Sequence, residues 1–107
     1  MAVAKPPDDL IATMTDPQGR TVWLTQERWE HIIEGHPEVE RHLESLKKCV
    51  QTAEKRTKGR YDGTEKLWTC NLGPAKWFFV LVRYEGRTGT IRTALADGRG
   101  PRQGDEI

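Results

Sequence analysis

The run WFFVLV at residues 77–82 is the feature that most restricts how this 107-residue chain folds. Its six successive apolar residues leave no polar face, so they predict a central strand of a sheet, covered on both sides. Strand-like stretches flank this run in the sequence, at residues 64–72 and 89–96. The turn residues Gly73 and Pro74 precede the run and the turn EGRTG follows it, so we expect the three strands to form an antiparallel meander.

The first half of the chain shows a different order of elements. Residues 11–25 read as a hairpin, because its turn DPQG has proline and glycine at positions that a tight turn prefers. Thr25 is a suitable N-cap for a short helix over residues 26–34. A second helical pattern opens at Pro37 and continues to Ala53.

Together these elements predict a single small α+β domain over residues 1–107. The N-terminal hairpin and the helices are expected to pack on one face of a curved antiparallel β-sheet. Residues 1–9 and 98–107 are expected to be a flexible leader and tail, and the basic stretch 55–63 a loop.

Charge is divided along the chain, although the formal net charge is only +1. Residues 1–45 hold four Lys or Arg against nine Asp or Glu, whereas residues 46–107 hold thirteen against seven. A basic half can hold a polyanion such as RNA by releasing its counterions, but a solvated surface is the commoner explanation of a charge run. The sequence has no apolar run of membrane-spanning length and no signal-peptide pattern, so a cytoplasmic protein with no membrane partner is expected.

His31 and His36 are the two residues whose chemistry the sequence leaves most open. A helical zinc site uses histidines four residues apart, whereas these lie five apart, about 140° around a continuous helix, and Gly35 and Pro37 interrupt that helix. No third ligand is suitably spaced, so we predict no metal site. Cys49 falls on an apolar helical stripe, which favours a core thiol over a nucleophile. Metal-free acid–base chemistry remains, against the plain alternative of polar residues on a helix surface.

The stretch VWLTQERWEHIIEGHPEVE, residues 22–40, resembles the opening of small phage-associated nuclease-like domains of the barnase/EndoU/colicin/RelE-like (BECR) class. TIRTALAD, residues 90–97, is similar to the closing strand of that class, so the resemblance covers most of the chain. Four residues match the first motif at the expected spacing: Trp29, His31, His36 and Pro37.

This resemblance implies a metal-independent ribonuclease without a cofactor, often a bacterial or phage toxin with a cognate immunity or antitoxin protein. Such a toxin can also be one module of a larger protein that is delivered into target cells. In such an enzyme the 2′-OH of the RNA attacks the adjacent phosphate while one group removes its proton and another protonates the leaving oxygen. The resemblance makes His31 and His36 the acid–base candidates and Thr93 a contact to phosphate or to the 2′-OH. Trp29 is expected in the core, because Ile32 and Ile33 follow it at helical spacing.

The arginine that would stabilise the phosphate follows from strand alternation rather than from the motif. Alternation places Arg92 and Thr93 on opposite faces of the last strand, and Arg83 and Tyr84 on opposite faces of the central one. The sequence does not decide which face carries the cleft, so all four residues are candidates. Arg60, in the basic stretch, is a further candidate for binding substrate.

The expected function is therefore cleavage of RNA, and two other classes stay open. One is a non-catalytic module on the same fold that binds nucleic acid or protein, including a nuclease that has lost its activity. The other is an immunity or antitoxin protein whose acidic residues, between Glu27 and Glu44, cover a basic toxin.

Overall fold

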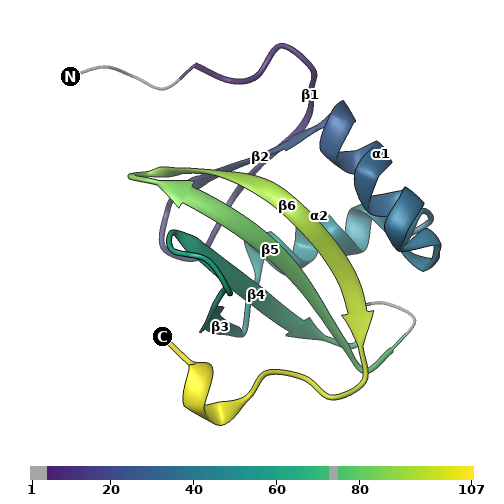
Figure 1. Cartoon of the computed structure of the whole chain (residues 1–107), viewed down its shortest axis with the longest axis vertical. Coiled ribbons are helices and arrows are strands. Elements are labelled where there is room, and N and C mark those ends of the chain that lie inside the picture. The colour runs from purple at the N-terminus through teal and green to yellow at the C-terminus, as the bar shows by residue number, and fades with distance from the viewer. Residues whose placement is uncertain (1–4, 73–74) are drawn as a thin grey trace.

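The computed structural model describes residues 5–72 and 75–107, so the turn expected at Gly73 and Pro74 and the start of the leader lie outside the described residues. The described chain is an α+β domain with a six-stranded sheet in the order β1-β2-β6-β5-β4-β3. Both α-helices lie on the same face of this sheet (Figure 1), which confirms the expected fold class. The elements are β1 (Leu10–Thr15), β2 (Thr21–Thr25), α1 (Gln26–Gly35), η1 (Pro37–Val39), α2 (Leu43–Gln51), β3 (Lys55–Lys58), β4 (Thr64–Cys70), β5 (Trp77–Glu85), β6 (Thr88–Asp97) and η2 (Gln103–Asp105).

The apolar run forms most of β5, which lies inside the sheet between β6 and β4 and is antiparallel to both, as predicted. Phe78, Val80 and Val82 point toward the helices and are fully buried. We call this the inner face of the sheet. The opposite, outer face carries no α-helix among the described residues. Leu81 on it is half-buried, but Phe79 is only 6 % exposed and packs against Trp68, so the apolar run is covered fully on the inner side and in part on the outer side.

The sheet is mixed rather than wholly antiparallel, because β2 pairs with β6 in parallel. The hairpin of β1 and β2 forms as predicted. Parallel strands need a long crossover connection, and the helices and the three intervening strands between β2 and β6 supply one. No local pattern in the sequence predicts this pairing, because it joins strands that are far apart in the chain.

The basic stretch expected as a loop begins with an edge strand, β3, which pairs with β4. Thr57 within it is 2 % exposed, and its hydroxyl oxygen accepts a hydrogen bond from Trp68 Nε1 at 2.9 Å. The tail returns to this edge, as Figure 1 shows, and the Ile107 N–H donates to the Arg56 carbonyl oxygen at 3.0 Å. Lysine and arginine are typical of edge strands that are protected from further pairing. Because of these basic residues, the stretch was predicted to be a loop rather than a strand.

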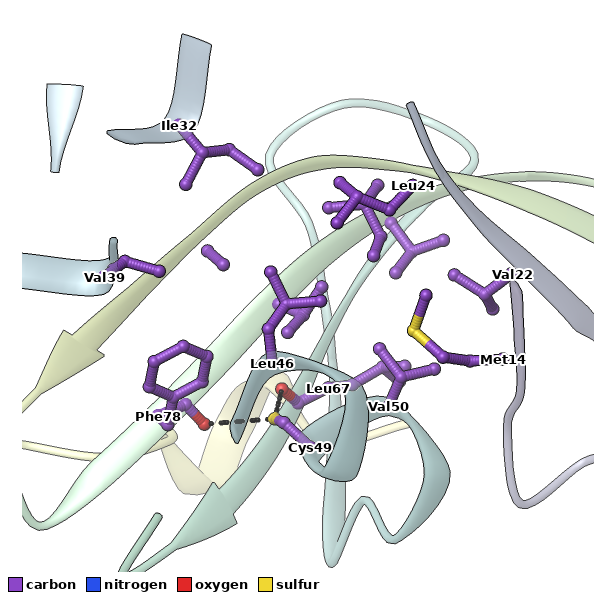
Figure 2. Packing of buried hydrophobic residues seen from close by; sticks show 14 residues of the cluster. Met14, Val22, Leu24, Ile32, Val39, Leu46, Cys49, Val50, Leu67 and Phe78 are labelled. Carbon is purple, nitrogen blue, oxygen red and sulfur yellow. Dashed lines mark hydrogen bonds between the residues drawn. The ribbon is translucent and has the colours of Figure 1, made fainter. Parts of the chain in front are cut away.

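The core lies between the helices and the inner face of the sheet (Figure 2). Leu46 and Cys49 of α2 are fully buried there against the meander, and the Cys49 thiol lies 3.2 Å from the Leu67 carbonyl oxygen. Burial raises the pKa of the Cys49 thiol to about 12, which makes it an inert core thiol, as its position in the apolar stripe predicts. Trp29 of α1 packs against the same core, half-buried.

Candidate active site

The shortness of β2 determines how α1 meets the sheet. β2 pairs with β6 only opposite Thr88–Thr90, and the chain then enters α1 directly, with the Thr25 hydroxyl accepting from the Arg28 N–H at 3.1 Å, as the predicted N-cap. α1 therefore lies beside the part of β6 that β2 leaves unpaired, and it packs against that strand (Figure 1). Arg28 Nη2 donates a hydrogen bond of 2.6 Å to the backbone carbonyl oxygen of Arg92 on β6. One side of α1 thus reaches around the strand to the outer face.

A cleft of about 430 Å³ lies where this side of α1 meets the outer face, and we call it the basic cleft. Its described lining holds three arginines and two histidines, and none of the described lining residues is acidic. Pockets of this size are typical of binding and catalytic sites. The lining residues are Arg28, His31, Gly35, His36, Tyr61, Thr64, Leu81, Arg83, Arg92 and Thr93.

Arg92 and Thr93 both line the basic cleft, which corrects the prediction that they face opposite ways. The reason is a β-bulge: Ile91 pairs with Val82 and Thr93 pairs with Leu81, so Arg92 is an extra residue in β6. A bulge resets the alternation of side chains and often lies beside a functional site. As a result Ile91 faces the core, while Arg92 and Thr93 follow one another on the outer face.

His31 and His36 line the basic cleft from different backbone segments. His31 is exposed on α1, whereas His36 follows the last helical residue as the C-cap, where its N–H donates to the Ile32 carbonyl oxygen at 2.7 Å. His36 Nδ1 lies 3.7 Å from a Glu38 carboxylate oxygen, which is beyond hydrogen-bond distance but attracts the ring in its protonated form. The break after Gly35 therefore lets two histidines that cannot share one helical face reach a common cleft.

Arg28 is the charged residue of the described cleft lining that sequence reasoning missed, and the polar residues Tyr61 and Thr64 were not predicted to line it either. Its Nε is buried without a hydrogen-bond partner among the described residues, while its Nη2 is held by the Arg92 carbonyl. Burial, with the neighbouring Arg92 cation adding to it, lowers the pKa of Arg28. The spacing of Arg28 and His31, three residues apart on one helix face, was the signal that would have placed the arginine beside the histidine.

The remaining sequence candidates divide between the two faces of β5. Arg83 lines the basic cleft. Tyr84 points to the opposite face, where its hydroxyl donates to the Asp16 carboxylate at 2.8 Å and its ring lies 3.6 Å from the Arg20 guanidinium carbon. Burial, with the Asp16 hydrogen bond adding to it, raises the pKa of Tyr84.

Arg60 is exposed beside Tyr61 and is not among the residues that line the basic cleft.

Across residues 5–72 and 75–107, no group of three or more His, Cys, Asp or Glu side chains is arranged to hold a metal ion. Within the same residues, no helix has the length and apolar character needed to cross a membrane.

Comparison with known proteins finds no family model that matches the chain and no curated protein that is similar to it.

Proposed function

We propose that this protein is a metal-independent endoribonuclease that acts through attack of the RNA 2′-OH on the adjacent phosphate. The observation that carries the proposal is the composition of the basic cleft, whose described lining combines two histidines with three arginines and has no acid. RNA cleavage of this kind needs two groups that transfer protons and cations that stabilise the charge on phosphorus. The cleft offers both without a cofactor.

The proton transfers fall to the histidines. Histidine changes its charge near neutral pH and so serves as base or acid. Both His31 and His36 line the cleft, so one would remove the proton from the 2′-OH and the other would donate a proton to the 5′ leaving oxygen.

Arg28 and Arg92 suit the phosphate itself. Both residues line the cleft, and the hydrogen bond from Arg28 Nη2 to the Arg92 backbone carbonyl fixes the Arg28 guanidinium there. Guanidinium groups bind phosphate oxygens through charge-assisted hydrogen bonds. An anion placed between the two cations would relieve their repulsion and gain from both. The Thr93 hydroxyl, next to Arg92 because of the bulge, would donate to a phosphate oxygen or contact the ribose.

The test is incubation of the purified protein with RNA in excess EDTA. We expect cleavage that leaves 2′,3′-cyclic phosphate or 3′-phosphate ends, because the 2′-OH is the nucleophile. His31→Ala and His36→Ala should each lower the rate about 10²- to 10⁴-fold. His42→Ala is the matched control, since this third histidine lies outside the basic cleft and should keep full activity. Equal cleavage by all three variants would refute the assignment.

A second candidate is a non-catalytic protein that binds RNA or a basic protein partner. The observation that favours a protein partner is the exposure of Glu27, Glu30, Glu34, Glu38 and Glu44 along the helical side of the molecule. RNA that is bound but never cut would support the binding module. Growth arrest on induced expression in bacteria would favour a toxin, and normal growth would favour the immunity or antitoxin class.

A further inference from the structure

A second groove adjoins the basic cleft on the outer face of the sheet. Its volume is about 530 Å³, and it shares Arg83 and Arg92 with the cleft. Its other described lining residues are Lys5, Trp23, Glu85, Thr88 and Thr90. Any long substrate bound at the two shared arginines would therefore meet this groove next.

Trp23 is the one large aromatic side chain among the described residues that line the groove. Backbone register places it in a single row across the sheet, with Thr13 of β1 on one side and Thr90 of β6 on the other. Arg83 follows Thr90 in the same row, so Trp23 lies about 10 Å, two strand spacings, from an arginine of the basic cleft. Threonines on both sides leave the half-buried indole without a large neighbour along the row.

The other three tryptophans pack against other apolar side chains of the domain. Trp29 packs on the core. Trp68 packs against Phe79 with ring centres 4.7 Å apart, and the Trp77 ring meets Trp68 edge-on at 6.3 Å. Trp23 belongs neither to the core cluster nor to any aromatic pair of the described residues. A partly exposed tryptophan in a groove beside cations is the arrangement by which proteins stack single-stranded bases.

The charge of the groove fits the same ligand. The described lining of the groove has three basic residues, Lys5, Arg83 and Arg92, and one acidic residue, Glu85, so its net charge is positive. A phosphate backbone can follow the arginines while a base turns toward the indole, because every base has an aromatic face.

We propose that Trp23 is a stacking subsite for a nucleobase of single-stranded RNA, one nucleotide removed from the phosphate held at the basic cleft. This inference rests on the proposed function, since it assumes RNA in the adjoining cleft. It adds that the enzyme takes unpaired RNA, because a base engaged in a duplex cannot present its face to a side chain.

The test measures binding apart from cleavage. The probe is a fluorescein-labelled single-stranded RNA octamer with 2′-fluoro sugars, which lack the attacking hydroxyl. Trp23→Leu should weaken binding roughly 5- to 150-fold, the range for loss of one stacked base. Trp23→Phe should keep most of the affinity. Trp77→Leu is the matched control, a half-buried outer-face tryptophan outside both clefts, and should bind like the parent.

Two further measurements separate stacking from charge and from misfolding. Inorganic tripolyphosphate has the charge without the bases, so it should bind the parent and Trp23→Leu equally. Octamer binding should quench tryptophan fluorescence in the parent, and Trp23→Phe should abolish that quenching, a readout that survives if Trp23→Leu fails to fold.

Unchanged affinity of a folded Trp23→Leu, equal weakening by Trp77→Leu, or quenching that persists in Trp23→Phe would each overturn the subsite. Cleavage of the all-ribose octamer together with any of these results would leave the nuclease proposal intact. Trp23-dependent binding without cleavage would support the subsite and refute the nuclease. A parent protein that binds no octamer would refute both.

Discussion

Arg28 donates a hydrogen bond from Nη2 to the backbone carbonyl oxygen of Arg92, 2.6 Å away, and this contact joins α1 to the edge of β6 that β2 leaves unpaired. The Arg28 guanidinium is thereby fixed at the basic cleft, which Arg92 also lines and whose described lining has no carboxylate to neutralise the two cations. Like charges that line one cleft favour an anion between them. Because we propose that phosphate binds at these cations, the contact would link the packing of α1 to the proposed site.

Arg28→Gln is expected to lower kcat/KM for RNA about 10²- to 10³-fold, the usual loss when one donor to a developing negative charge is removed. The unfolding free energy should fall by only about 1 kcal/mol, since a single hydrogen bond on a partly exposed side chain is lost. Steady-state kinetics and urea unfolding measure the two effects. Arg41→Gln, an exposed arginine outside the cleft, is the control and should match the parent in both.

Because of the β-bulge, we expect substitutions at two neighbouring residues of β6 to affect cleavage, whereas strand alternation would predict an effect at only one of them. Because Arg92 and Thr93 both face the basic cleft, Arg92→Gln and Thr93→Val should each slow cleavage, with about a tenfold loss for each hydrogen bond of 1.4 kcal/mol removed. Thr93→Ser, which keeps the hydroxyl, should restore most of the rate. A rate that falls for one position and stays at the parent level for the other would show that only one of them meets the substrate.

Sequence patterns predicted the elements that depend on neighbouring residues. The hairpin, the Thr25 cap, the packing of Trp29 and the meander all follow from spacing along one segment. The bulge could not be predicted in this way, because it is defined by the register of β6 against β5. Simple alternation from Ile91 therefore gives the wrong face for Thr93.

Long-range contacts explain what else was missed in the candidate site. Arg28 gains its position from a carbonyl 64 residues away, and the parallel pairing of β2 with β6 determines which edge α1 can occupy. Neither relation leaves a local trace in the sequence. Alternation alone could not decide whether Tyr84 or Arg83 faces the cleft, because this depends on which face of β5 the helices cover.

Tyr84→Phe should change stability and leave RNA cleavage unaltered. The variant removes the hydrogen bond to Asp16, which costs about 0.5 to 1.5 kcal/mol of unfolding free energy, while the ring can still pack under Arg20. Urea unfolding at neutral pH measures the loss. A large fall in kcat/KM with an unchanged unfolding midpoint would instead place the Tyr84 hydroxyl in the reaction.

The free energy of unfolding is expected to depend on pH through the Asp16 carboxyl. Burial alone would raise the pKa of its carboxyl, but hydrogen bonds from the Arg20 N–H, the Tyr84 hydroxyl and the Arg20 side chain outweigh burial and lower it below 3.8. The stabilisation by the carboxylate is thus complete above the unfolded value and is lost as pH falls through the lower folded value. Asp16→Asn should cost about 1 to 3 kcal/mol at pH 7 and flatten the fall in stability below about pH 4. Urea midpoints from pH 7 to pH 2 measure both effects, and an Asp16→Asn curve parallel to that of the parent would contradict the assignment.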